Sequence, residues 1–320
     1  MNTSYTLGSM HLKNRVLVAS GTFGYGNEAA PYTDLRALGG IVTKSVSWLP
    51  RQGNAPTRIA ETPAGMLNSI GLANVGIDAF IAEKLPFLRE IDTEIIVNIA
   101  ASTTEEYIRI LERLEGEEDI AAYEINVSCP NVKEGGLNFG TRCDMTETIT
   151  RELRRRTERT LIIKLTPNVT HIADFAKSCE NEGADAVALI NTLVGMAVNF
   201  RTRRPVLSTI TGGLSGPAIK PVALAKVFEA SKAISIPIIG IGGITTWQDA
   251  IEFLLVGASA VQVGTASFRD PDAAVKIARG METYCREEGV EDIQDLVGAL
   301  HIDAGTAAPG FVKAREQEKV

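Results

Sequence analysis

Eight short apolar runs recur along this 320-residue chain, and this repetition constrains the possible folds more than any other feature. Each run is rich in β-branched residues and almost continuously apolar, as is typical of parallel strands that are buried on both faces. A polar turn and an amphipathic stretch follow each run. The runs cover residues 16–20, 40–45, 94–99, 122–127, 161–165, 186–191, 237–243 and 260–264.

The spacing of these runs favours a closed barrel. Eight runs within about 250 residues leave about 31 residues for each strand and its return helix, which is the size of a βα unit. We therefore predict an α/β fold, a single (β/α)8 TIM barrel, rather than an open doubly wound sheet. No Pro/Ser-rich linker divides the chain, so residues 1–320 are expected to form one domain. Within it, residues 1–14 are interpreted as an N-terminal hairpin that closes the bottom of the barrel, and residues 301–320 as a polar C-terminal tail.

The stretch that begins at Thr103 shows the helical pattern expected between two strands. Thr103 and the glutamates that follow it resemble a helix cap. The residues on one face would be Tyr107, Ile108, Leu111 and Leu114. Two connections are unusually long, residues 130–144 and residues 192–216, and such loops in a compact domain are typically lids or binding loops.

Charge and composition exclude several classes of protein. The chain has 32 Lys and Arg against 39 Asp and Glu, so its formal charge is −7, which disfavours non-specific binding to nucleic acid. No apolar run approaches the roughly 18 residues of a membrane span, and the N-terminus lacks the apolar core of a secretory signal. Only four cysteines occur, without a CxxC pair, so neither a disulfide scaffold nor a zinc site is indicated. These features predict a cytoplasmic protein.

The predicted strand ends carry amides and lysines rather than carboxylates. Catalytic residues of such barrels lie at the carboxyl ends of the strands. In chain order, these ends carry Ser20, Lys44 with Ser45, Asn98, Asn126 with Cys129, Lys164, Asn191 with Thr192, Gly242 with Gly243, and Gly264 with Thr265. No cluster of Asp, Glu or His is among them, so neither a metal site nor a paired-carboxylate glycosidase is predicted. Two ammonium groups and several amides suit an anionic ligand with amide-like edges, such as a flavin or a pyrimidine.

Glycine-rich turns follow the last two predicted strands. Loops at these places in such barrels often bind phosphate through backbone N–H groups, and glycine lets the backbone approach closely. We interpret residues 240–246 and 264–267 as a phosphate site, with tight turns that bind nothing as the alternative. Residues 24–29 match the dinucleotide fingerprint, but they lie several residues beyond the strand, and the next strand ends without an acidic residue, which argues against a Rossmann site.

Cys129 directly follows the fourth predicted strand and stands at the start of a glycine-rich loop. A thiolate there could act as a nucleophile or a general base. No histidine lies close in sequence, which disfavours acyl transfer and favours proton abstraction. The other cysteines, Cys143, Cys179 and Cys285, are interpreted as inert buried side chains. Glu124 should point into the barrel, where a buried carboxylate needs a partner such as a barrel lysine.

The segment NVSCPNVKEGG, residues 126–136, resembles the catalytic subunit of dihydroorotate dehydrogenase. Further matches lie in the family's order along essentially the whole chain. They are SGTFGYG, TKSVSW, PAGMLNSIGLAN, VNIAAS, IKLTPN, INT, GGLSGPAIKP and GIGGI. Members of this family oxidise dihydroorotate to orotate in pyrimidine biosynthesis, using a bound FMN.

The resemblance implies positions for both ligands. FMN would contact Ser20, Lys44, Ser45, Asn98, Asn126, Lys164, Ile190, Gly216, Gly242, Gly243, Gly264 and Thr265. Dihydroorotate would lie against Lys44, Asn68, Ser69, Ile70, Gly71, Leu72, Asn126, Asn191 and Thr192. Lys164 would stabilise negative charge on the reduced flavin. Cys129 would remove a proton from the substrate while hydride passes to the flavin, and the loop 130–144 would open for substrate exchange.

The resemblance also indicates the electron acceptor. Membrane-attached, quinone-linked members carry serine at the base position and an apolar N-terminal extension, whereas this chain has Cys129 and starts directly in the barrel. The VKEGG that follows is similar to the NAD-linked class 1B type, a heterotetramer of two catalytic chains and two electron-transfer subunits. The FAD and [2Fe–2S] cluster of that type would sit on the partner subunit, because four scattered cysteines cannot ligate a cluster here.

The alternatives to an NAD-linked dihydroorotate dehydrogenase are a fumarate-linked class 1A enzyme, an FMN barrel acting on RNA such as a dihydrouridine synthase, a flavin-free lyase or isomerase barrel, and a non-catalytic scaffold.

Overall fold

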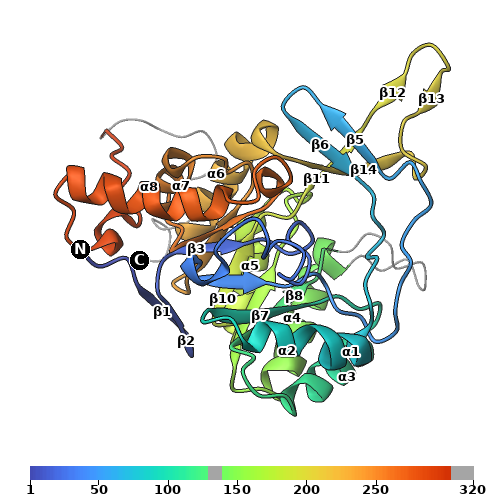
Figure 1. The fold of residues 1–320 in the computed structure, drawn as a ribbon, viewed down its shortest axis with the longest axis horizontal. Coiled ribbons are helices and arrows are strands. Elements are labelled where there is room, and N and C mark those ends of the chain that lie inside the picture. The colour runs from blue at the N-terminus through green and yellow to red at the C-terminus, as the bar shows by residue number, and fades with distance from the viewer. Residues whose placement is uncertain (129–138, 304–320) are drawn as a thin grey trace, which may run out of the picture.

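A closed barrel of eight parallel strands forms the centre of the computed structural model, which describes residues 1–128 and 139–303 (Figure 1). Each strand pairs with the next in chain order, and the last pairs with the first. The strands are β3 (Val16–Val18), β4 (Gly40–Val42), β7 (Glu94–Ile99), β8 (Ala122–Asn126), β9 (Thr160–Lys164), β10 (Ala186–Leu189), β15 (Ile238–Ile241) and β16 (Ala260–Val263). The predicted TIM barrel is confirmed, and each predicted strand coincides with an observed one.

Helices cover the outside of the barrel between successive strands (Figure 1). They are α1 (Ile77–Ala79), which continues through a π-turn at Phe80–Lys84 into α2 (Leu85–Arg89), then α3 (Thr104–Glu115), α4 (Cys143–Arg154), α5 (Ile172–Asn181), α6 (Lys220–Ser231), α7 (Trp247–Leu255) and α8 (Ala273–Glu287). Short 3-10 turns lie at Leu35–Ala37, Phe139–Thr141, Pro217–Ile219, Thr265–Phe268 and Ile293–Leu296. In the segments that the structure describes, no helix is long and apolar enough to cross a membrane.

The first connection departs from the regular repeat. Residues 19–39, all of them described, contain a single 3-10 turn and no α-helix between β3 and β4. Gly21, Gly24 and Gly26 each adopt a positive φ in this connection, a conformation that interrupts a right-handed helix. The expectation that every strand is followed by an amphipathic helix is therefore wrong for this unit.

Helix α3 follows the predicted pattern with one correction. The Thr103 hydroxyl accepts a hydrogen bond from the Glu106 N–H at 3.1 Å, so the expected N-cap is present. Tyr107 is fully buried, as predicted, but the apolar face continues through Ile110 rather than Ile108, which is half-buried. The helix is thus turned slightly about its axis relative to the face predicted from the sequence.

Alternation along the strands divides the barrel interior into an apolar and a polar layer. On β8, Ala122 joins the apolar cluster inside the barrel, whereas Tyr123 and Ile125 belong to the cluster between the barrel and its helices. Glu124 therefore shares the inward parity of Ala122, one step nearer the carboxyl end. The same step leads from Ile162 to Lys164 on β9. The polar layer lies at the carboxyl end of the strands.

The opposite end of the barrel is closed by an antiparallel hairpin of β1 (Tyr5–Leu7) and β2 (Met10–Leu12). Leu7, Met10 and Leu12 have no exposed surface and pack in the same apolar cluster as the lower interior of the barrel. The Thr160 hydroxyl at the start of β9 accepts a hydrogen bond from the Ser9 N–H at 2.8 Å. This contact joins the hairpin to the barrel rim.

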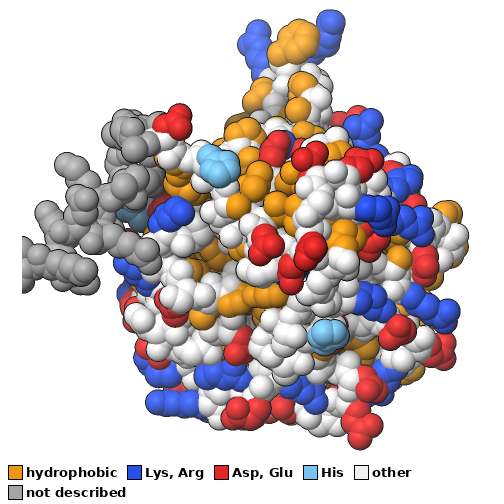
Figure 2. All heavy atoms as spheres, turned by 90° about the vertical axis from the view of Figure 1, so that its left-hand side faces the viewer, with side chains coloured by type: hydrophobic (Ala, Val, Ile, Leu, Met, Phe, Trp, Pro, Cys, Tyr) orange, Lys and Arg blue, Asp and Glu red, His pale blue; other side chains and the backbone are white. Residues whose placement is uncertain are grey.

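A second sheet lies beside the carboxyl ends of the strands, built from two long insertions (Figure 1). Its strands, in order across the sheet, are β11 (Leu193–Met196), β14 (Thr211–Ser215), β6 (Gly65–Asn68) and β5 (Ile59–Thr62). The long connection 192–216 therefore forms a β-structure, and its tip extends as a hairpin of β12 (Val198–Asn199) and β13 (Arg204–Pro205). Hydrophobic side chains flanked by basic ones are visible at the protruding tip in Figure 2, where Phe200 is 77% exposed.

Candidate active site

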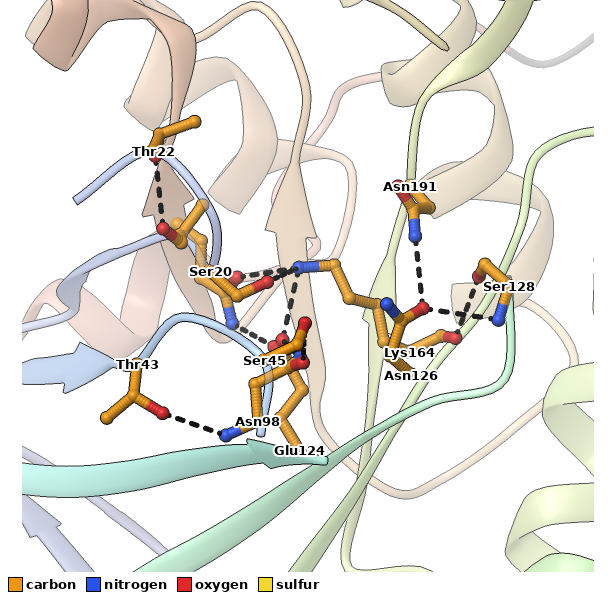
Figure 3. Close-up of polar contacts among 12 residues, drawn as sticks. Ser20, Thr22, Thr43, Ser45, Asn98, Glu124, Asn126, Ser128, Lys164 and Asn191 are labelled. Carbon is orange, nitrogen blue, oxygen red and sulfur yellow. Dashed lines mark hydrogen bonds and ion pairs between the residues drawn. The ribbon is translucent and has the colours of Figure 1, made fainter. Parts of the chain in front are cut away.

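A buried carboxylate organises the polar layer of the barrel. The Lys164 Nζ lies 3.1 Å from Oε1 of Glu124, and neither side chain has more than 5% of its surface exposed. The Asn98 amide donates to the same oxygen at 2.6 Å, and the Gln262 amide donates to Oε2 at 2.6 Å. The expected barrel lysine is thus the partner of Glu124, and Figure 3 shows Lys164 and Asn98 converging on it.

Serine hydroxyls extend this network toward the rim of the barrel. The Ser45 hydroxyl, just beyond β4, donates to the side-chain Oδ1 of Asn98 at 2.6 Å, which leaves the Asn98 NH2 group oriented toward Glu124. Lys164 also donates to the Ser20 hydroxyl at 3.2 Å (Figure 3). Residues on or just beyond six strands, β3, β4, β7, β8, β9 and β16, are therefore joined by hydrogen bonds within the protein itself.

A second group of amides lies at the ends of β8 and β10. The Asn191 amide donates to Oδ1 of Asn126 at 3.2 Å, and the Ser128 N–H donates to the same oxygen at 3.2 Å (Figure 3). The Tyr107 hydroxyl fixes the backbone here by donating to the Asn126 carbonyl at 2.7 Å. No residue in the described part of the chain accepts from the Asn126 NH2 group, so it is available as a donor.

The glycine-rich turns after the last two strands each contact the end of β14. A Cβ at Gly243, where φ is +75°, would lie 2.9 Å from the Gly216 carbonyl and 2.8 Å from the Lys220 Cβ. The Thr265 hydroxyl donates to the Ser215 hydroxyl at 2.8 Å. Only glycine fits the close approach at residue 243, and both turns lie against the end of β14.

Asp249 holds the turn after β15 in this position. Its Oδ2 accepts from the N–H groups of Thr245 and Thr246 at 2.8 and 2.9 Å, while Oδ1 accepts from the Lys220 ammonium at 2.6 Å. Burial favours the neutral acid, but the hydrogen bonds from Lys220 and the Thr245 backbone outweigh it and lower the pKa of Asp249 to about 2.

The predicted substrate segment, residues 68–72, begins at the last residue of β6 in the second sheet. The Asn68 amide donates to the Gly213 carbonyl at 3.3 Å, and the Asn54 amide donates to the Ser69 carbonyl at 2.9 Å. The Ser69 hydroxyl oxygen is buried and has no partner in the described part of the chain. Leu72 has a φ of +56°, an uncommon conformation for a residue other than glycine. An unpaired buried hydroxyl next to a strained backbone is typical of a ligand site.

Two charged residues that the sequence did not single out, Arg58 and Glu28, influence the pKa of Lys44. Burial lowers the pKa of the Lys44 ammonium, the nearby Arg58 guanidinium lowers it further, and Glu28 opposes both. The Arg58 guanidinium donates to the carbonyls of Gln52 and Asn54 at 3.2 and 3.3 Å. Lys44 and Arg58 are therefore close enough to repel each other, and an anionic group bound beside Lys44 would relieve that repulsion.

The predicted catalytic residue, Cys129, and residues 130–138 of the predicted lid lie outside the described residues, as do residues 304–320 of the tail. Of the other cysteines, Cys179 and Cys285 are buried as predicted, whereas the prediction is wrong for Cys143, which is half-buried at the start of α4. Burial raises the pKa of all three thiols, that of Cys179 to about 12, so they are protonated at neutral pH.

The structure brings most of the predicted FMN contacts to one end of the barrel. Those joined by direct contacts include Ser20, Ser45, Asn98, Lys164, Gly216, Gly243, Thr265 and, through Gly242, Ile190. Thr192 lies beside the second sheet, since a Cβ at Gly213 would meet its hydroxyl at 2.2 Å. The sequence did not identify Gln262 or Arg58 as candidate site residues. Gln262 could have been found, because it is the single polar residue of an otherwise apolar strand.

Within residues 1–128 and 139–303, no group of three or more His, Cys, Asp or Glu could hold a metal ion.

The fold and this cluster define the class of protein, a TIM barrel with a polar cluster at its strand ends. A family model described as dihydroorotate dehydrogenase matches residues 3–284. The chain belongs to the dihydroorotate dehydrogenase family, which confirms the resemblance seen in its motifs.

Curated relatives agree with this assignment, and a solved structure agrees with the fold. The chain is 55% identical over 299 residues to a protein of Geotalea daltonii named dihydroorotate dehydrogenase B (NAD(+)), catalytic subunit, covering 93% of this chain and 98% of the relative. It is 56% identical over 294 residues to the protein of that name from Pelobacter propionicus, covering 92% and 97%. A crystal structure of DHODH from Eimeria tenella in complex with ferulenol has a TM-score of 0.78 at 21% identity, covering 93% of this chain and 88% of that one, and supports the fold.

The Asp249→Asn variant should lose stability in a pH-dependent way. The carboxyl has a lower pKa in the folded protein than its usual 3.8, so its contribution is present above that value and is lost as the pH falls toward 2. We expect the variant to be less stable by about 2 kcal/mol at pH 7 and by about half as much at pH 3. Urea unfolding at both pH values measures this. Glu252→Gln, which removes the half-exposed second partner of Lys220, should cost less than about 1 kcal/mol; an equal loss in both variants would contradict the assignment.

Proposed function

We propose that this chain is the catalytic subunit of an NAD-linked dihydroorotate dehydrogenase, an oxidoreductase of pyrimidine biosynthesis. The observation that carries the proposal is the convergence at one barrel end of lysines, amides and glycine turns in a chain more than half identical to relatives of that name. The reaction removes one proton and one hydride from adjacent carbons of dihydroorotate and leaves a double bond in orotate.

The residues at the mouth fit FMN. The turns at Gly243 and Thr265 offer backbone N–H groups that no hydrogen bond between described residues uses, and these could bind a phosphate. Lys164, Asn98 and Asn126 present donors suited to the carbonyl and nitrogen edge of the flavin ring. Bound FMN would supply the hydride acceptor. Lys164 would favour negative charge on the ring, since its ammonium is nearly dry and electrostatic interactions are strong there.

The residues facing this region fit the substrate. The unpaired Ser69 hydroxyl and the amides of Asn68 and Asn191 can each form hydrogen bonds with the imide edges of a pyrimidine. Lys44 would bind the carboxylate, with Arg58 adding to the positive potential. A ligand with a carboxylate at one end and amide-like edges elsewhere satisfies these groups together, whereas an apolar ligand would leave them unpaired.

Cys129 is proposed as the general base that removes the substrate proton. It directly follows Ser128, whose hydroxyl donates to the Lys164 backbone carbonyl at 3.2 Å at the end of β9. A thiolate has the basicity needed for proton abstraction near neutral pH when positive charge lies close by.

The Cys129→Ser variant should be reduced by dihydroorotate at least about 100-fold more slowly at neutral pH, because a serine hydroxyl is a much weaker base. Stopped-flow loss of flavin absorbance measures this rate, and orotate affinity should stay nearly unchanged. Cys179→Ser, at a buried cysteine far along the chain, is the matched control and should retain the native rate. Near-native reduction of the Cys129→Ser protein would remove the base assignment.

A partner subunit is implied by the relatives' name, which calls each a catalytic subunit. We infer that the partner carries FAD and a [2Fe–2S] cluster, that two of each chain form a heterotetramer, and that NAD+ is the final acceptor. The four scattered cysteines of this chain support locating the cluster elsewhere, and their small number supports a cytoplasmic location.

The protein purified alone should be yellow and should bleach on anaerobic addition of dihydroorotate, because the substrate reduces the bound flavin. NAD+ should restore the colour rapidly only when the partner subunit is present. A colourless protein, or a yellow one that dihydroorotate does not bleach, would contradict the proposed function. Rapid turnover of the isolated chain with fumarate would instead support the fumarate-linked type.

Orotate affinity should fall at alkaline pH through Lys44. Burial and Arg58 lower the pKa of its ammonium below the usual 10.5, so the positive charge is lost as the pH rises through that lowered value. We expect up to about tenfold weaker binding for each pH unit above it. In Lys44→Arg the charge persists, so the difference between the two titrations isolates the lysine from changes in orotate itself. Parallel titration curves would show that Lys44 does not bind the carboxylate.

A further inference from the structure

Glu124 is the most deeply buried charge of the barrel and has no exposed surface. Its two oxygens accept hydrogen bonds from three side chains on three other strands, namely Asn98, Lys164 and Gln262. Within the described residues, Lys164 is the one cation in contact with it. A single ion pair thus lies in the centre of the barrel, directly below the proposed flavin site.

This ion pair is not needed to fill the barrel. One layer lower, the same inward-facing rows of β8, β9 and β16 hold Ala122, Ile162 and Ala260, which pack without polar atoms. Removing two charges from water is costly, and apolar residues of similar volume often stabilise a protein as well or better. The retention of a buried carboxylate and ammonium at this one level therefore points to a role in the chemistry above it.

The pair also determines how much charge the site presents. With both groups ionised, the Glu124–Lys164 pair is neutral, although its positive end lies nearer the rim, where Lys164 also contacts Ser20 at 3.2 Å. Without the carboxylate, a full unbalanced positive charge would remain in a nearly dry site. Such a charge would favour the reduced flavin, which is more negative than the oxidised one, because electrostatic attraction is strong where water is excluded.

We propose that Glu124 is a positioning residue that holds Lys164 and Asn98 against the flavin site and, by neutralising Lys164, keeps the reduction potential of the flavin low. The inference rests on the proposed function and extends it. Electrons taken from dihydroorotate must continue to a nicotinamide acceptor, which only a low-potential donor reduces. Lys164 supplies attraction for the reduced ring, and Glu124 limits that attraction so that the electrons can leave again.

Glu124→Gln tests the proposal, because it preserves side-chain volume and most of the hydrogen bonding while removing the negative charge. The FMN potential of the purified protein is measured by anaerobic titration with a chemical reductant and a reference dye. We expect the equilibrium constant for flavin reduction to rise at least about tenfold, which for a two-electron couple is about +30 mV. A change of less than about threefold would overturn the proposal.

Glu229→Gln is the matched control. Glu229 on α6 is also buried, and its carboxylate lies 3.3 Å from the Lys226 ammonium, but this pair is on the outside of the barrel. Both substitutions break a buried Lys–Glu pair, so both should lower the melting temperature. Only Glu124→Gln should change the flavin potential. A similar shift in Glu229→Gln would mean that loss of stability, and not the charge below the flavin, causes the effect.

Glu124→Asp separates charge from shape and decides the matter if Glu124→Gln does not fold. The shorter carboxylate keeps the negative charge but loses the native contacts, so the melting temperature should fall while the potential stays within about threefold of native in equilibrium constant. A tenfold shift in Glu124→Asp would overturn the proposal. Because a chemical reductant is used, the potential can be measured even if dihydroorotate does not reduce the protein. Failure of the proposed function is therefore distinguishable from failure of this inference.

Discussion

The carboxylate of Glu124 holds the polar end of the barrel together. Its contacts with Lys164, Asn98 and Gln262 join four strands that are distant in sequence, and each of these residues lies one inward step above an apolar position of the same strand. Because side chains alternate along a strand, a single pair of residues two positions apart is enough to place an apolar core below and a polar site above. The stability of the barrel and the chemistry of its mouth therefore depend on the same strands without competing for the same positions.

Much of the fold could be predicted because the barrel strands are buried on both faces. Such strands are read as continuous apolar runs, and the regular distance between them fixes the number of units. Their carboxyl ends must meet at one rim, so residues as far apart as Ser20 and Lys164 could be assigned to one site and are found in contact. The parity of β8 likewise required an inward Glu124 with a partner, and the partner is the lysine at the end of the neighbouring strand.

The features that sequence reasoning missed depend on long-range pairing or on a single residue. Nothing near β6 reveals that it pairs with β14, about 145 residues later, so the second sheet was not foreseen. Gln262 was passed over because one polar residue does not change the apolar character of β16, and its importance arises only from Glu124 across the barrel. Ile108 rather than Ile110 was assigned to the buried face of α3, because both residues fit an apolar stripe within the tolerance of helical spacing.

The hairpin at the amino-terminal end of the barrel has a consequence for the order in which ligands bind and dissociate. Leu7, Met10 and Leu12 fill the lower end, so among the described residues the hairpin closes the barrel on that side and leaves the end beside the second sheet for a ligand to enter. In a site that is closed at one end, the ligand that lies deepest must bind first and dissociate last. A prosthetic group at the deepest position would then stay bound, while smaller ligands above it would exchange with every turnover.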